Sequence, residues 1–156
     1  DFFDRLNVVV IERNVVADFC QNGNCFSIDK DGIIFERNSS TTDLIKIIDK
    51  ESTTTFSLGQ KAMETDQLSK ILDIYSRLST DLKIPVRELT ISSEDRLIVL
   101  TQEGWEIYFY LKGDISWQIA KLKAVLDEKI PKEKRKDLQY IELRFENLAP
   151  FKYRAK

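Results

Sequence analysis

The dipeptide Asn22-Gly23 constrains the fold of this chain more than any other feature. Asn-Gly fills both positive-φ positions of a type I′ turn, the tightest connection between two antiparallel strands. With these two residues as the loop, Gln21 pairs with Asn24 and closes the turn by exchanging hydrogen bonds. The sequence therefore predicts a β-hairpin here, with one strand over residues 15–20 and the returning strand over residues 26–28.

Two cysteines flank this turn, and their state bears on the compartment. Cys20 and Cys25 form the next pair out, a non-hydrogen-bonded pair with Cα atoms about 4.5 Å apart, at the short end of what a disulfide bridges. A zinc site would need two more soft or imidazole ligands, and the chain has two cysteines and no histidine. A thioredoxin-type pair is C-x-x-C, unlike this spacing. Two interpretations stay open: reduced, half-buried thiols, or the Cys20–Cys25 disulfide that we predict, which would imply an oxidising, extracytoplasmic location.

Composition limits the class of partner. With 156 residues and 42% hydrophobic content, the chain can build one real core, as one domain or one and a piece. A net charge of -2 gives no electrostatic reason to expect nucleic acid, and "PKEKRKD" at 131–137, broken by Glu133, favours a solvated loop. No stretch reaches the roughly 18 apolar residues of a membrane span. Because the sequence opens in mid-pattern without Met, we expect a fragment of a longer protein.

The hydrophobic period changes along the chain. "DKDG" at 29–32 is turn chemistry that separates the hairpin from a third strand over residues 33–36, which predicts an antiparallel meander. "LIKII" at 44–48 favours another strand. A helix is expected from Thr65 and ends before Pro85. Its apolar stripe consists of Leu68, Ile71, Leu72, Tyr75 and Leu78.

The second half predicts strands over residues 86–92, 96–101, 105–111 and 140–146, with one more helix between the last two. Asp114 is the expected N-cap of that helix, and Pro131 ends it. Its predicted buried residues are Ile115, Ile119, Leu122, Leu126 and Ile130. Strict alternation in "WEIYFYL" places Trp105, Ile107, Phe109 and Leu111 on one side. The fold class is therefore α+β: a mostly antiparallel β-sheet with two amphipathic helices packed on one side.

The closing strand "YIELRFE" is expected to alternate as well. The inward set is Ile141, Leu143 and Phe145, and the outward set is Tyr140, Glu142, Arg144 and Glu146. "FKYR" at 151–154 then ends the chain, so one of these two strands is expected at a sheet edge.

The sequence offers little catalytic chemistry. Without histidine there is no Ser-His-Asp triad, no Cys-His pair and no imidazole metal site. The five glycines stand singly, so there is no Gly-rich phosphate loop, and acidic pairs fall in predicted turns. The tryptophans, Trp105 and Trp117, favour packing over a ligand cage. We predict a protein that is not an enzyme and uses no cofactor or metal.

Several motifs in order resemble one family. "NVVVIERNVVADF", a hairpin and "FSIDKDGIIFE" come first; "IPVRELTIS", "GWEIYFYLKG", a helix with "KLKAVL" and "YIELRFEN" follow. This series is similar to the FtsQ/DivIB bacterial cell-division proteins. The resemblance implies that residues 1–17 are the last strand of a POTRA domain and that 18–156 are the β domain after it. It also implies a parent anchored by one N-terminal transmembrane helix.

Family members are non-enzymatic scaffolds that bind the small coiled-coil proteins FtsB and FtsL at the division septum, on the extracytoplasmic side. The resemblance therefore implies protein partners of this kind and a place in the divisome. The alternative is another extracytoplasmic module that binds by adding a partner strand, such as a POTRA-containing secretion or adhesion component.

The resemblance also places the partner contact on the closing segment. The matching positions directly after the Y-[IV]-D-L motif are Arg144, Phe145 and Asn147, although Phe145 could equally be core. Alternation and proximity, not the resemblance, add Tyr140, Glu142, Phe151 and Tyr153. A sheet edge has unpaired N–H and C=O groups that a partner strand can satisfy. The alternative is an ordinary solvated face with a frayed tail.

Overall fold

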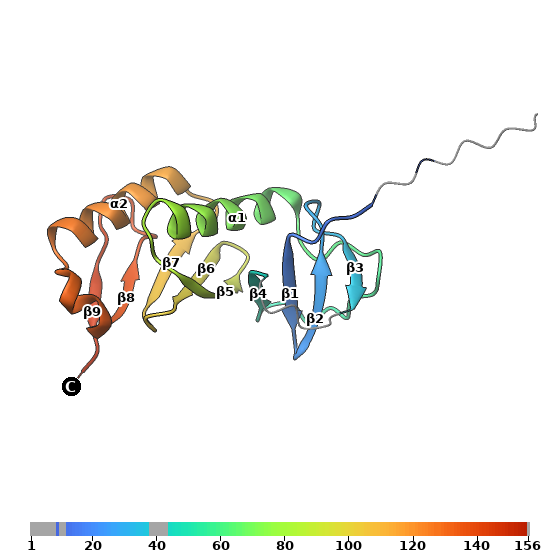
Figure 1. Cartoon of the computed structure of the whole chain (residues 1–156), viewed down its shortest axis with the longest axis horizontal. Coiled ribbons are helices and arrows are strands. Elements are labelled where there is room, and N and C mark those ends of the chain that lie inside the picture. The colour runs from blue at the N-terminus through green and yellow to red at the C-terminus, as the bar shows by residue number, and fades with distance from the viewer. Residues whose placement is uncertain (1–8, 10–11, 38–43, 156) are drawn as a thin grey trace, which may run out of the picture.

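One mixed sheet of nine strands organises the chain. The computed structural model describes residues 9, 12–37 and 44–155. The β-branched run over residues 6–11, which predicts one more strand, lies outside this part except for Val9. The strand order is β3-β2-β1-β4-β5-β6-β7-β8-β9, and both α-helices lie along one side of the sheet (Figure 1). The strands are β1 Ala17–Gln21, β2 Asn24–Ile28, β3 Ile34–Arg37, β4 Lys46–Asp49, β5 Val86–Ser93, β6 Arg96–Thr101, β7 Glu106–Tyr110, β8 Leu138–Glu142 and β9 Phe151–Tyr153.

The predicted α+β class is confirmed, and chain connectivity explains why the helices share a side. The β1–β2–β3 meander is antiparallel as predicted, but β4 pairs in parallel with both β1 and β5, and β7 pairs in parallel with β8. Helix α1 (Thr65–Thr80) connects β4 to β5, and α2 (Ile115–Glu128) connects β7 to β8. Both crossovers step in the same direction across the sheet. The right-handed rule for such crossovers therefore puts both helices on one face.

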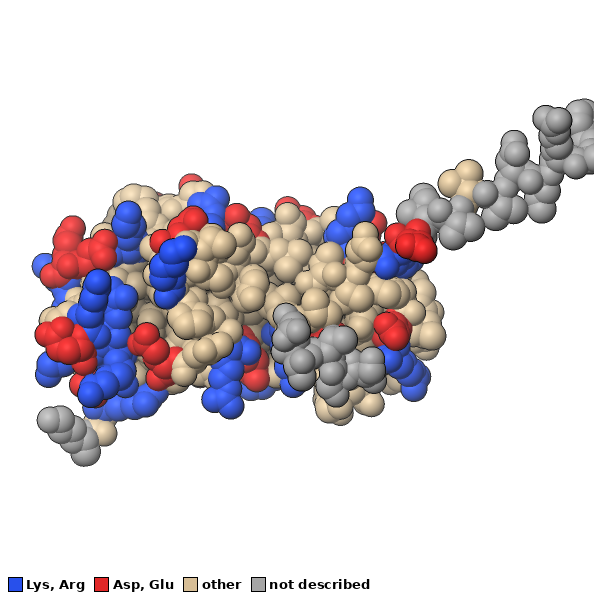
Figure 2. Space-filling view, in the orientation of Figure 1, with Lys and Arg blue, Asp and Glu red and all other residues tan. Residues whose placement is uncertain are grey.

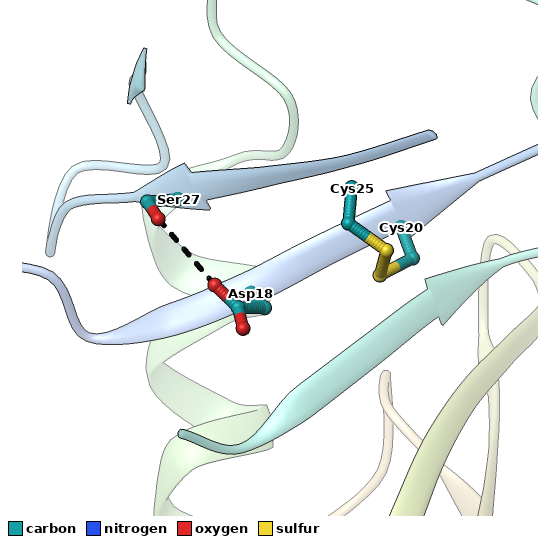
Figure 3. The surroundings of a disulfide bond; sticks show 4 residues. All are labelled: Asp18, Cys20, Cys25 and Ser27. Atoms are coloured by element: carbon teal, nitrogen blue, oxygen red, sulfur yellow. Dashed lines mark hydrogen bonds between the residues drawn. A yellow bond between two sulfur atoms is a disulfide. The ribbon is translucent and has the colours of Figure 1, made fainter. Parts of the chain in front are cut away.

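The Asn-Gly hairpin has the predicted register. Asn22 and Gly23 have φ values of 49° and 79°, and Cys20 stands opposite Cys25. The two cysteines are joined in a disulfide, with Cα atoms 4.0 Å apart (Figure 3). Further along the same pair of strands, the Ser27 hydroxyl donates to the Asp18 carboxylate at 3.4 Å (Figure 3). Of the two interpretations left open, the structure therefore has the disulfide.

The core fills the layer between the helices and the sheet. Its largest fully buried side chains include Trp105, Phe19 and Phe109, so the alternation predicted for residues 105–111 is confirmed. In α1 the predicted stripe needs a correction, because Ile74 is fully buried whereas Leu72 and Tyr75 are half-buried at its flank. In α2 the Asp114 side chain caps the helix by accepting from the Trp117 N–H at 2.9 Å. Its predicted buried set is also confirmed.

The expected alternation of the closing strand is wrong at its C-terminal end. β8 ends at Glu142, and the alternation stops after the buried Leu143, so Phe145 is 53% exposed and not part of the core. Glu142 lies on the face away from the helices but is only 6% exposed. The segment over residues 131–137, predicted as a solvated loop, is exposed except for the half-buried Arg135, but residues 132–137 form a short 3₁₀ helix, η1 (Lys132–Asp137).

Candidate functional site at the C-terminal sheet edge

Strand β9 forms one end of the sheet, and its outer backbone groups are open. The Glu142 N–H donates to Pro150 O at 2.8 Å, and the Arg154 N–H donates to Asp137 O at 2.9 Å. Because backbone groups along a strand point alternately to its two sides, the N–H and C=O groups of Phe151 and Tyr153 point away from β8. Within the described residues no strand pairs with them. We call this side of β9 the open edge.

The opposite end of the sheet is covered where β3 begins, at Ile34. Ile34 of β3 exchanges hydrogen bonds with residues 59–60: its N–H donates to Gln60 O at 2.9 Å, and its C=O accepts from the Gly59 N–H at 2.7 Å. The Ala62 N–H also donates to Gly32 O at 2.8 Å. The segment 57–62 therefore takes the place of a further strand there, and the part of β3 around Ile34 is not available for pairing.

The aromatic side chains of β9 extend the hydrophobic core to the open edge. Phe151 pairs with Ile141 and Tyr153 with Leu138, and both of these β8 partners are fully buried. The two rings are half-buried and meet edge to face, with centroids 5.7 Å apart. An added strand would complete their burial, because it would lie beside them on the side that is now exposed.

Helix α2 holds the loop that leads into β9. The Lys121 Nζ donates to Leu143 O at 2.8 Å and to Leu148 O at 3.4 Å, and it also donates to Phe145 O. One turn earlier, the Trp117 Nε1–H donates to Glu146 O at 2.8 Å. Burial lowers the pKa of Lys121, while the charge of Glu142 acts in the opposite direction. Lys121 is thus a positioning residue for the loop over residues 143–150.

Glu142 and Arg144 form a closed pair on the outer face. The guanidinium donates twice to the Glu142 carboxylate, at 2.7 and 2.6 Å, and the Arg144 N–H donates to the same group at 3.2 Å. The hydrogen bond to Glu142 raises the pKa of Arg144. Of the predicted site residues, these two are therefore engaged with each other, and Glu142 is shielded from solvent.

Tyr140 belongs to a stack that crosses three strands. Its ring stacks on that of Tyr108 with the centroids 5.3 Å apart, and the Arg96 guanidinium lies over the Tyr108 ring, 4.7 Å from its centroid. The Tyr108 hydroxyl donates to Glu106 at 2.6 Å. Burial, and then this carboxylate, raise the pKa of Tyr108 to about 12. The Tyr140 ring is therefore held in this stack on the outer face beside β9.

Exposed apolar side chains lie near the start of β9. Phe145 is 53% exposed, Leu148 66% and Trp117 49%, and Asn147 is exposed beside them. Trp117 and Phe145 line a cleft of about 400 Å³ between α2 and the loop. Sequence reasoning missed Lys121 and the exposure of Trp117. The sequence signal that could have identified Lys121 was its position on the flank of the apolar stripe of α2.

The described residues show no metal-binding group and no membrane span. In the described ranges, no three His, Cys, Asp or Glu side chains lie together as a potential metal site. No helix in that part of the chain has both the length and the apolar character needed to cross a membrane.

Comparison with known proteins identifies the family. Residues 19–144 match the family described as "Cell division protein FtsQ/DivIB, C-terminal". The chain belongs to the FtsQ/DivIB family. Its role is therefore in cell division, as the resemblance implied. No curated protein matches the chain. The family match ends at Arg144, so the loop over residues 145–150 and the edge strand β9 lie beyond it.

Proposed function

We propose that this FtsQ/DivIB chain is a non-enzymatic scaffold of the bacterial divisome that binds FtsB-like and FtsL-like division proteins through its open edge. The observation that carries this proposal is the outward direction of the Phe151 and Tyr153 backbone groups. Unpaired edge groups are a template for strand addition, and at the opposite end of the sheet the segment 57–62 already takes the corresponding position beside Ile34.

The location follows from the family and the disulfide. We place the domain on the extracytoplasmic face of the membrane at the septum, where Cys20 and Cys25 can stay oxidised. The parent is proposed to have one transmembrane helix and a POTRA domain, with residues 1–17 as the last strand of POTRA and 18–156 as the β domain. Within the described residues, Ala17 is already part of β1.

The edge also sets the pattern of a partner strand. Side chains alternate across a strand, so every second residue of an added strand would lie beside Phe151 and Tyr153 and should be apolar. The alternate residues of the added strand would lie on the opposite face of the sheet, beside Lys152. Lys152 pairs with Tyr140 and is exposed. Phe145 and Asn147 would contact the partner next to the start of β9.

A matched pair of variants tests whether the backbone of this edge is used. Tyr153→Ala removes the ring and keeps the outward N–H, whereas Tyr153→Pro removes both. Proline is tolerated on an edge strand where its missing N–H would face solvent, so both variants should fold. Against the extracytoplasmic segment of the FtsB-like protein of the same organism, calorimetry should show at least tenfold weaker binding for Pro than for Ala, about 1.4 kcal/mol.

Circular dichroism and thermal melting provide the fold control for this pair. Equal affinities for Tyr153→Pro and Tyr153→Ala, in two natively folded proteins, would mean that the partner does not use this edge. Arg144 is a poorer first variant, because its removal would leave the shielded Glu142 carboxylate unpaired and could disturb the fold itself.

A further inference from the structure

Positively charged side chains gather at the end of the molecule that holds η1 and β9, with several carboxylates among them (Figure 2). We define the basic ridge as Lys132, Lys134, Lys136, Lys152 and Arg154, all exposed. The first three belong to η1, Lys152 belongs to β9, and Arg154 follows it directly. Arg135 lies among them and is half-buried, and its Nε has no hydrogen-bond acceptor in the described part of the chain.

The members of the ridge form no salt bridges within the described residues. Three lysines elsewhere in the described residues form salt bridges: Lys61 with Glu64, Lys70 with Asp66 and Lys112 with Glu94. Other exposed lysines, such as Lys30 and Lys50, form none there, so the ridge is distinguished by the clustering of its charges. Within the ridge, Arg154 donates to the Gly104 carbonyl. Glu133 and Asp137 are the acidic residues within η1 itself. They leave η1 with an excess of positive charge.

The ridge adjoins one particular end of the open edge. The Arg154 N–H donates to Asp137 O at 2.9 Å, which joins the last residue of η1 to the residue after β9. Tyr153 pairs with Leu138, the first residue of β8. The other end of β9 is preceded by the loop with the exposed Phe145 and Leu148. The open edge therefore has a basic end and an apolar end.

We propose that the basic ridge receives a run of acidic side chains from the same partner segment that adds to β9. This inference rests on the function proposed above and specifies the partner further: its acidic run lies at the end of the added strand that reaches Tyr153. An acidic polypeptide fits better than a non-protein polyanion, because only a polypeptide satisfies the outward N–H and C=O groups beside the ridge.

A charge-reversal pair tests the ridge with a matched control. Lys132→Glu/Lys134→Glu changes two exposed ridge lysines, and Lys30→Glu/Lys50→Glu makes the same charge change at exposed lysines near β2 and β4. Stopped-flow binding of the FtsB-like extracytoplasmic segment should show at least tenfold weaker affinity for the ridge variant, mainly through slower association. The control should stay within about threefold, and the difference should shrink in 0.5 M salt, where charges are screened beyond about 4 Å.

The outcomes separate this inference from the proposed function. If Tyr153→Pro abolishes binding but the ridge variant binds like its control, the edge is used without the ridge and this inference is wrong. If neither variant changes affinity, both proposals fail. Ridge-dependent binding to phosphatidylglycerol vesicles, without ridge-dependent binding to the protein segment, would assign the ridge to an anionic surface and also overturn the inference.

Discussion

The two ends of the sheet differ in how their edges are finished. At the β3 end, the segment 57–62 hydrogen-bonds to the backbone around Ile34, and the adjacent β1–β2 hairpin is cross-linked by Cys20 and Cys25. At the β9 end, the last strand has three residues and nothing pairs with its outer side within the described residues. Sheet edges generally invite pairing with other chains. The open edge of β9, at the opposite end of the sheet from the part of β3 that is covered around Ile34, is therefore the candidate site for a partner strand.

The two ends of the sheet are also stabilised by different kinds of interaction. The covered end relies on backbone hydrogen bonds between segments of the chain, and the β2–β3 turn is fastened by Asp29, which accepts from the Asp31 and Ile33 N–H groups and from Arg13. The open end relies on side chains of α2, chiefly Lys121, which hold the loop before β9. Variants at each end should therefore have different consequences.

The largest effect is expected from Gly32→Ala, which should break the covered end. Gly32 has φ +76°, and a Cβ there would lie 2.3 Å from the Met63 carbonyl oxygen, a backbone atom that cannot easily move. Gly23→Ala is the matched control, since its φ is +79° and nothing lies within 4 Å of the added Cβ. Urea unfolding should show a loss of roughly 3 kcal/mol or more for Gly32→Ala and about 1–2 kcal/mol for the control, the cost of a left-handed residue.

Equal losses for the two glycine variants would contradict this account. They would mean that the Met63 backbone gives way without cost, and hence that the segment after residue 57 is not tightly fixed against the β2–β3 turn. A large loss confined to Gly32→Ala would confirm that the covered end is built by close backbone packing.

The next effect is expected at the open end. Lys121→Met keeps most of the side-chain volume and removes the ammonium group from three carbonyls, which should lower the free energy of unfolding by about 2 kcal/mol. Lys123→Met changes an exposed lysine of the same helix and should stay within about 0.5 kcal/mol. Hydrogen exchange should increase in residues 143–153 for Lys121→Met. Unchanged exchange there would show that the loop does not depend on Lys121.

How far the sequence predicted the fold depended on the range of the interactions. The hairpin at Asn22-Gly23, the Asp114 cap and the alternation around Ile107 were predicted correctly, because local residues decide each of them. The place of β4 between β1 and β5 was not predicted, since parallel partners are separated by long crossovers that leave no local signal.

The candidate site was harder to predict for the same reason. The expected outward and inward sets of "YIELRFE" extended a period of two past Leu143, but there the chain turns toward Lys121, 22 residues away, and Phe145 is left exposed. The sequence analysis expected one of the last two strands at a sheet edge, and β9 is that strand. The pairing of Arg144 with the shielded Glu142 could not, because two outward residues of one strand gave no sign of burial.

The third effect concerns the disulfide at the covered end. Because the cross-linked loop is short, the bond should contribute no more than roughly 2–3 kcal/mol and should stabilise the hairpin without deciding the fold. Protein exported to an oxidising compartment should resist thiol alkylation until it is reduced, as read by mass spectrometry. Two freely alkylated cysteines before reduction would rule out the disulfide in that compartment. A Cys20→Ala/Cys25→Ala variant that fails to fold would show that the disulfide is required for folding and contributes more than the expected free energy.

The smallest effect is expected from the pH dependence of the Asp29 turn. Burial tends to raise the pKa of Asp29, but hydrogen bonds from the Ile33 N–H, Arg13 and the Asp31 N–H outweigh it and leave the pKa below its ordinary value. A carboxyl with a lower pKa in the folded state stabilises the fold above its unfolded pKa of about 3.9. That stabilisation is lost as the pH falls through the folded value. Urea unfolding between about pH 2 and pH 6 should therefore show a steeper acid loss for the wild type than for Asp29→Asn, which has no carboxyl to protonate. Parallel curves would mean that Asp29 fastens the covered end through hydrogen bonds that do not need its charge.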